Sequence, residues 1–316
     1  RVTATRQKRR AAKESARWEQ LARSVSAALP GEVDAIHVMD QEADDYDLLA
    51  ALQQAQSRYV IRACPTRQTA DAKLAVKAVL ARQGATLFRE VPIAPRSVQK
   101  EVKSRGRHPA RTERLATLEI RWGTVTLPRR QYNEATDRTL TLQAVHVAEP
   151  NPPAGEAPIE WMLFTSDVVE RLEDATAVVD HYRARWIIEE YFKALKTGCG
   201  FEKRQLTSLL GLLRALALFI PMAWRLLVLR HLGRAPQPRP VGDVLDRTQV
   251  RLLRKLLACR RYQLPHRPTM RDVMLGVAAL GGHIKNNGAP GWLVLGRALT
   301  RLLDAEVGWR LARDEM

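Results

Sequence analysis

Cysteine is scarce in this sequence, and its few cysteines are poorly spaced for structural chemistry. Cys64, Cys199 and Cys259 are odd in number and lie far apart. They fit neither a disulfide framework nor a zinc site, which needs closely spaced pairs of ligands. The sequence therefore predicts a reduced, cytoplasmic protein.

Acidic residues are also few. The 316 residues include 34 Asp and Glu against 51 Lys and Arg, which gives a formal net charge of +17 and a pI near 10.4. Such an excess of positive charge favours a polyanionic partner such as DNA, whose phosphates supply most of the non-specific affinity. An anionic membrane surface is the alternative, and it requires an apolar anchor.

Long uncharged apolar runs are absent. The one candidate is Leu206–Leu232, and it is interrupted by Arg214, Pro221, Arg225 and Arg230. Because a membrane-spanning helix needs about 18 or more consecutive apolar residues, this stretch is expected to be a buried helix, and no membrane partner is expected. The basic amino terminus is not followed by an apolar segment, so no secretory signal is visible.

The first part of the chain alternates helix-forming and strand-forming segments. Residues 1–29 are basic and helix-forming, and Pro30-Gly31 ends them. The apolar run Ala35–Met39 predicts a buried strand. Asp40 directly follows this strand. In open α/β sheets, ligands bind at the carboxyl ends of central strands. The next expected elements are a helix from Asp44, as its cap, to Gln56 and a strand over Arg58–Ala63.

Between residues 65 and 158 the pattern changes to short alternating strands. Leu118, Ile120 and Trp122 alternate with charged residues, and Gly123 is expected to turn the chain. The region is predicted to be a β-rich, basic insertion in an α/β core. Its charged loop fits DNA binding, and equally a solvated, disordered charge run. The candidate DNA-binding residues in this loop are Lys100, Lys103, Arg105 and Arg107.

The remainder of the chain returns to the core pattern and then becomes helical. Glu160–Thr165 is a predicted strand, and a helix is expected from near Asp174. Residues 206–316 are mostly helical, with breaks at proline and glycine clusters. The sequence therefore predicts two domains, 1–205 with the insertion at about 65–158, and 206–316.

The stretch Tyr182–Lys196, YRARWIIEEYFKALK, is predicted to be one amphipathic helix. At about 100° per residue its polar residues gather on one face and present a carboxylate flanked by cations and a phenol. Such a face suits a metal ion and a phosphate, although an Arg–Glu pair four residues apart also fits an ordinary surface helix. The polar face comprises Tyr182, Arg185, Glu189, Lys193 and Lys196, and the opposite, buried face comprises Ala184, Ile187, Ile188, Tyr191, Ala194 and Leu195.

The spacing Tyr-x2-Arg-x3-Glu-x6-Lys resembles the signature of the IS4-type DDE transposases, the group of Tn5-like enzymes. The similarity runs without a gap from Trp161 to Lys196 and continues into Lys196-Thr197-Gly198. The pattern Asp40-Gln41-Glu42-Ala43-Asp44 also resembles the family. The resemblance implies an RNase H-like catalytic core, incomplete in this chain, with the β-rich insertion and an α-helical carboxyl-terminal domain. It also implies a nucleoid-associated bacterial protein.

The resemblance further implies catalytic and DNA-binding roles. Such enzymes use carboxylates to hold two divalent ions, Mg²⁺ or Mn²⁺, about 3.5–4 Å apart. Asp40 and Glu189 match the second and third catalytic acids and would be the metal ligands. The other residues matched to roles are Tyr182, Arg185 and Lys196 for orienting phosphates, Trp161 for stacking on a flipped base, and Arg62 and Lys193 for DNA contact. Taken singly, Asp40 also fits a strand-end turn, Arg62 a solvent-facing strand residue and Trp161 a core tryptophan.

The first catalytic acid of the family has no counterpart here. The family carries it on an earlier strand, but only 39 residues precede Asp40, and the nearest upstream acid, Asp34, lies beside the same strand. The chain also begins with Arg1 and not with Met. It is therefore expected to be an amino-terminally truncated copy that binds DNA weakly and cleaves nothing alone.

Three functions fit these observations. The first is a cut-and-paste transposase that acts on transposon ends and forms a homodimer through residues 206–316, where Thr269–Gly282 and Gly291-Trp292 resemble the dimerisation region of the family. The alternative is a non-catalytic subunit that inhibits a full-length transposase by mixed dimerisation. The third is a plain DNA-binding protein, which would have no use for a pairing of Asp40 with Glu189.

Overall fold

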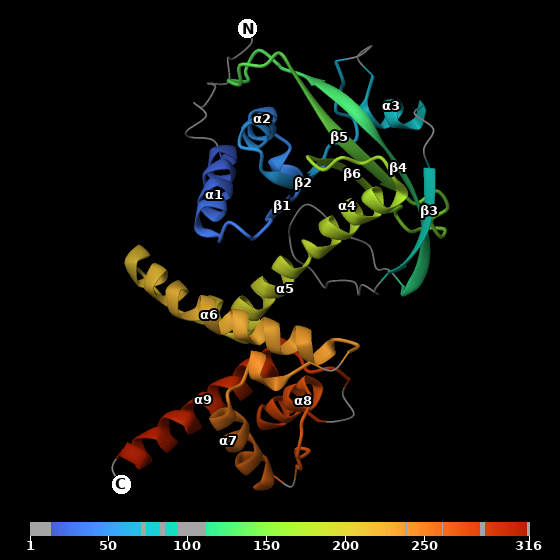
Figure 1. The fold of residues 1–316 in the computed structure, drawn as a ribbon. Coiled ribbons are helices and arrows are strands. Elements are labelled where there is room, and N and C mark those ends of the chain that lie inside the picture. The colour runs from blue at the N-terminus through green and yellow to red at the C-terminus, as the bar shows by residue number, and fades with distance from the viewer. Residues whose placement is uncertain are drawn as a thin grey trace. The chain divides into compact units, whose positions relative to one another are not determined.

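The protein consists of two compact units, each with its own hydrophobic core. A computed structural model describes residues 14–70, 74–82, 86–93, 112–237, 239–260, 262–284 and 288–314. The units are Arg1–Arg185 and Trp186–Met316, and Figure 1 colours the chain through both of them. The predicted DNA-binding residues Lys100, Lys103, Arg105 and Arg107 lie outside the described residues.

The amino-terminal unit is built on one six-stranded mixed sheet. Its strand order is β1-β2-β6-β5-β4-β3. β1 and β2 are parallel, and every other neighbouring pair is antiparallel. The strands are β1 Ile36–Met39, β2 Arg58–Ala63, β3 Thr86–Ile93, β4 Arg114–Pro128, β5 Thr139–Ala148 and β6 Glu160–Thr165. The predicted strands that begin this unit and the one at Glu160–Thr165 are therefore confirmed.

The β-rich region differs from its prediction in two ways. β3, β4 and β5 continue the sheet of β1, β2 and β6, so among the described strands β1 lies at an edge and not at the centre. The expected turn at Gly123 is wrong, because Gly123 lies inside β4 and pairs with Ala144 of β5. A glycine in a strand pattern permits a turn but does not require one.

Helices cover both faces of this sheet (Figure 1). On one face, α1 (Glu14–Ala28), α2 (Tyr46–Gln54) and α3 (Val76–Arg82) pack over a core that includes Leu49 and Phe164. On the other face, α4 (Leu172–Ala184) packs over a core that includes Val60 and Leu163. Because side chains alternate along a strand, neighbouring strand residues belong to different cores.

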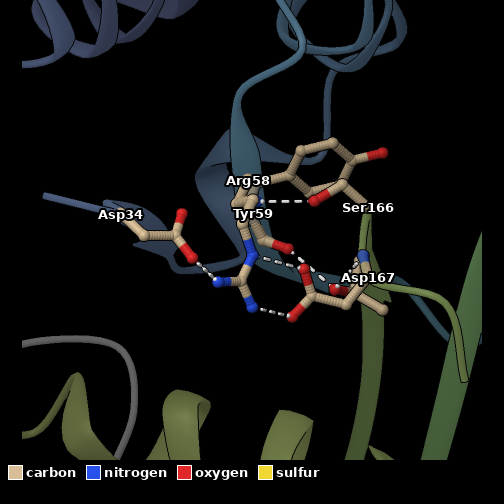
Figure 2. Close-up of polar contacts among 6 residues, drawn as sticks. Asp34, Arg58, Tyr59, Ser166 and Asp167 are labelled. Atoms are coloured by element: carbon tan, nitrogen blue, oxygen red, sulfur yellow. Dashed lines mark hydrogen bonds and ion pairs between the residues drawn. The ribbon is translucent and has the colours of Figure 1, made fainter. Parts of the chain in front are cut away.

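A guanidinium fixes the amino-terminal end of the parallel strands (Figure 2). Arg58, the first residue of β2, donates to both carboxylate oxygens of Asp167 at 2.8 Å and also pairs with Asp34, ahead of β1. The adjacent Tyr59 amide donates to Ser166 Oγ at 2.9 Å. These carboxylates raise the pKa of Arg58 above its ordinary value, chiefly through the hydrogen bonds to Asp167. The cluster therefore fixes one end of β1, β2 and β6, and the candidate site described below is at the opposite end.

The carboxyl-terminal unit is helical, as the sequence predicted. Its core includes Leu226 of α6, Leu253 of α7, Val277 of α8 and Leu299 of α9. The elements are α5 Ile187–Lys193, the π-helical η3 Ala194–Gly198, η4 Phe201–Lys203, α6 Leu209–Arg234, η5 Val241–Asp243, α7 Arg247–Ala258, α8 Met270–Leu280 and α9 Trp292–Asp314. The sequence placed the domain division at 205/206. The compact units divide earlier because η3 packs on α6 and α9.

Helix α6 is not the fully buried helix that the sequence predicted. Its second half supplies buried residues such as Leu226 and Leu229, whereas Leu209 and Leu218 in the first half are each 72% exposed. By length and composition alone α6 could cross a membrane. It is the one described helix of which this is true, and a single case is weak evidence. The prediction failed because apolar residues all around a helix indicate a tendency to be buried, but not a partner along its whole length.

Candidate active site

The turn after β1 presents Asp40 in a defined conformation. Asp40 is the N-cap of the short 3₁₀ helix η2 (Gln41–Ala43), and its Oδ1 accepts the Glu42 amide hydrogen at 3.1 Å. Within that helix, Ala43 is fully buried. The Asp40 carboxylate is partly exposed, so it can meet an external ligand while its backbone is fixed.

Asp44 fixes the far end of the same turn, and not the start of α2 as predicted. Its carboxylate accepts the Cys64 amide hydrogen at 2.9 Å and pairs with Arg67, with only 8% of the side chain exposed. Asp45 is the N-cap of α2 and accepts the Leu48 amide hydrogen at 3.1 Å. Burial raises the pKa of Asp44, and Arg67 opposes that shift. The turn that carries Asp40 is thus tied to the segment following β2.

Replacing Asp44 by asparagine is expected to lower the free energy of unfolding by about 2 kcal/mol, because Arg67 loses a charged hydrogen-bond partner in a partly buried site. The neighbouring Asp45→Asn variant is the matched control. Asparagine caps helices about as well as aspartate, so its effect should stay within about 0.5 kcal/mol. Urea denaturation of both variants measures the difference. Equal stability of the two would contradict a tethering role for Asp44.

Strand register places Asp40 beside Arg62. Met39 pairs with Ile61 in the parallel β1–β2 ladder, so Asp40, one residue further and still extended, is level with Arg62. Alternation puts both on the face of Val60, the face covered by α4. A carboxylate and a guanidinium of the predicted site therefore share the carboxyl-terminal ends of two adjacent strands.

An aromatic pair continues this face. Arg62 pairs with Leu163 of β6, and Trp161 lies two residues from Leu163 on the same side of the sheet. The Trp161 ring contacts the Tyr182 ring of α4 edge-on, with centroids 5.5 Å apart, and Arg185 lies over Tyr182 at 5.8 Å. The amino-terminal unit thus brings five predicted site residues to one face of its sheet, namely Asp40, Arg62, Trp161, Tyr182 and Arg185.

The predicted continuous helix over Tyr182–Lys196 is wrong. The α-helical hydrogen-bond pattern is interrupted at Arg185–Trp186 between α4 and α5, although both residues keep helical backbone angles, and the segment becomes π-helical from Ala194. The predicted faces are also wrong at Tyr182, which is 6% exposed, and at Ile187, which is 46% exposed, whereas Ala194 and Leu195 are buried as predicted. The reason is that the segment changes cores: Tyr182 belongs to the amino-terminal core and Ala194 to the carboxyl-terminal one.

The other predicted site residues lie in the carboxyl-terminal unit. Glu189 is a partly exposed residue in the first turn of α5. Its neighbour Glu190 is instead structural, pairing with Arg230 at 2.5 Å and with Lys193 at 2.8 Å. Burial alone would raise the pKa of Glu190, but Lys193 and Arg230 hold it below its ordinary value. Lys196, in η3, lies 3.3 Å from Glu202 and is exposed.

The chemistry of the donor set suits a hard divalent cation. Asp40 and Glu189 offer partly exposed carboxylate oxygens, the ligand type that Mg²⁺ and Mn²⁺ prefer. Within the part of the chain that the structure describes, no group of three or more His, Cys, Asp or Glu side chains could hold a metal ion. The two acids belong to different compact units, so each is considered separately as a candidate metal ligand.

A known protein family matches most of this chain. The family described as "Transposase DDE domain" matches residues 6–220, a range that includes Asp40, Glu189 and every strand of the sheet. This chain belongs to the DDE transposase family. The family acts on DNA and generally uses divalent metal ions. The partly exposed acids and the cations near them in each unit therefore belong to a protein with a DNA substrate.

Sequence reasoning missed two features of this transposase. The Asp44–Arg67 pair has no local signal, because the two residues are 23 positions apart and Asp44 also fits a helix cap. The close approach of Arg251 in α7 to Trp309 in α9 was missed for the same reason, although the spacing of Trp309 and Arg313 on one helical face could have indicated a cation near an aromatic ring.

Proposed function

We propose that this protein is of the IS4/Tn5 cut-and-paste type, a group of transposases with an RNase H-like core that cleave and transfer DNA strands at transposon ends. The observation that carries the proposal is the family match together with the Tyr182, Arg185, Glu189 and Lys196 spacing. The gathering of Asp40, Arg62, Trp161 and Tyr182 on one face of the amino-terminal unit supports it.

In this proposal Asp40 and Glu189 would each supply a carboxylate ligand to Mg²⁺ or Mn²⁺. The bound ions would supply Lewis-acid stabilisation of the attacking and leaving oxygens of the phosphodiester. Other phosphoryl-transfer enzymes use two ions that lie about 3.5–4 Å apart. Asp40 suits this role because the turn that carries it is fixed at both ends.

The cations of the site orient the DNA backbone. Arg62 and Arg185 present planar guanidinium groups that bind phosphate through two parallel hydrogen bonds, and Lys196 adds a point charge. Lys193 is proposed as a further backbone contact. Arg185 lies against the Tyr182 ring, which limits the freedom of its guanidinium and lowers the entropy lost on binding.

Trp161 is proposed to stack on a base taken out of the duplex. A base that leaves the helix loses its stacking, and an aromatic side chain offsets part of that loss. Trp161 is partly buried, and its ring packs against the Tyr182 ring with centroids 5.5 Å apart. We further propose that residues 206–316 mediate dimerisation and that the protein works in the cytoplasm at the nucleoid.

The proposal predicts that metal binding and DNA binding are coupled. If carboxylates and a DNA phosphate share the same ions, transposon-end duplex should raise the affinity for Mn²⁺ by at least about fivefold, and Mn²⁺ should raise the affinity for the duplex by the same factor. Titrating Mn²⁺ by electron paramagnetic resonance, with and without DNA, measures this factor. An affinity for Mn²⁺ that DNA leaves unchanged would contradict the shared site.

A further inference from the structure

Helix α7 has a basic face outside the predicted catalytic residues. Its apolar residues Leu252, Leu253 and Leu257 are buried in the carboxyl-terminal core. The opposite side of the helix is exposed, and cations recur along it every three or four residues, a spacing of about 4.5–6 Å along the axis. These exposed cations are Arg247, Arg251, Arg254 and Lys255.

The end of α9 adds to the same surface. Arg251 of α7 and Arg313 of α9 lie over the Trp309 ring, with guanidinium carbons 5.0 and 5.6 Å from its centroid. A hollow of about 360 Å³ beside them is lined by Thr248, Trp309, Arg310 and Arg313. Two helices that pack together therefore contribute cations to one patch.

Among the side chains that the structure describes, the acid paired with this patch is already engaged by its neighbours. Glu306, the acid nearest to Arg310 on α9, is 6% exposed. It accepts from Gln249 at 2.7 Å and pairs with Arg310 at 2.5 Å. Among the residues whose side chains the structure describes, Arg251 and Arg313 take part in no ion pair. The described side chains of the patch therefore keep a net positive charge.

We propose that this α7–α9 surface binds the phosphate backbone of duplex DNA without reading its sequence. Guanidinium groups match phosphate geometry, and contact with Trp309 restricts Arg251 and Arg313 in advance, so less conformational entropy is lost on binding. The choice of DNA as the polyanion rests on the proposed function. The surface belongs to the unit that carries Glu189 and not to the unit that carries Asp40.

The test measures the salt dependence of binding to a duplex of arbitrary sequence, with EDTA present to remove metal. Each lost phosphate contact lowers the slope of log K against log salt by about 0.9. Arg251→Gln with Arg313→Gln in the full chain should therefore lower the slope by about 2. A second pair on the same face, Arg254→Gln with Lys255→Gln, should also lower it. Anisotropy of labelled DNA gives the slopes.

Two control variants distinguish binding by this defined surface from an effect of the protein's overall positive charge. Arg214→Gln with Arg234→Gln removes the same charge from exposed positions of α6 and should leave the slope unchanged. Arg251→Lys with Arg313→Lys keeps the charges and should retain most of the wild-type slope. Equal losses from the α6 pair and from the α7–α9 pairs would overturn the proposal.

A vesicle experiment distinguishes DNA from an anionic membrane. The same variants are mixed with vesicles of phosphatidylglycerol and phosphatidylcholine. A loss of vesicle binding in the α7–α9 pairs, with DNA binding unchanged, would overturn the proposal and assign the surface to lipid. Because EDTA is present in the DNA assay, a failure of the Mn²⁺ coupling would not alter these results, so this inference and the proposed function fail separately.

Discussion

Replacing Glu189 by alanine is expected to abolish the coupling between Mn²⁺ binding and DNA binding. Removal of groups that merely support metal ligands costs about 10–100-fold in metal affinity, so the loss of a direct ligand should reach about 100-fold or more. Asp40→Ala should give a loss of the same order, although it lies in the other compact unit. The measurement is the Mn²⁺ titration with and without transposon-end duplex.

The chain offers matched controls for both acids. Glu190 adjoins Glu189 but is engaged by Arg230 and Lys193, so Glu190→Gln should lower stability and leave the coupling intact. Glu42 lies two residues from Asp40 in the same turn and is exposed, so Glu42→Gln should change neither. If Glu190→Gln removed the coupling and Glu189→Ala kept it, the third acid of the site would have been assigned to the wrong residue.

Much of the amino-terminal unit could be predicted because its signals are local. The runs Ile36–Met39, Arg58–Ala63 and Glu160–Thr165 are short and have apolar centres, and each is a strand. Their arrangement could not be predicted, because the order of strands depends on pairings between distant residues. Gly123 illustrates this limit: an isolated strand pattern with a glycine fits a hairpin, and only its pairing with Ala144 shows that β4 continues.

The residue identities of the candidate site stay predictions, whereas the conformation of the segment that carries several of them differs from its prediction. The spacing from Tyr182 to Lys196 was interpreted as one helix, since nothing in that segment breaks helical periodicity. The interruption arises because Tyr182 is buried against the sheet while Ala194 packs among the carboxyl-terminal helices. Tertiary packing determined which residues were buried, so Ile187 and Ile188 are exposed despite their apolar side chains.

Replacing Gly296 by alanine is expected to destabilise the carboxyl-terminal unit severely. A Cβ added at Gly296 would lie 1.9 Å from the carbonyl oxygen of Gly198 and 2.6 Å from its carbonyl carbon. Because these are backbone atoms at the end of η3, no side-chain rotation can relieve the clash. Inserting a methyl group into a packed site costs about 1–3 kcal/mol and sometimes more, so we expect a loss of about 3 kcal/mol in unfolding free energy.

Gly308 on the same helix is the matched control. A Cβ there meets nothing within 4 Å, and alanine is preferred over glycine in a helix by about 1 kcal/mol. Gly308→Ala should therefore leave stability unchanged or raise it slightly. Urea denaturation followed by circular dichroism separates the two effects, and a Gly296→Ala protein as stable as Gly308→Ala would show that α9 does not approach η3 so closely.

The close approach of α9 to η3 also bears on the proposed chemistry. Lys196 lies two residues before Gly198 in the π-helical segment, so any shift that accommodates a side chain at Gly296 moves the lysine proposed to contact phosphate. Gly296→Ala should therefore weaken binding of transposon-end duplex under conditions where the variant is still folded. Gly308→Ala should bind as the wild type does. Unchanged DNA affinity in a folded but destabilised Gly296→Ala protein would separate the packing role of η3 from the role proposed for Lys196.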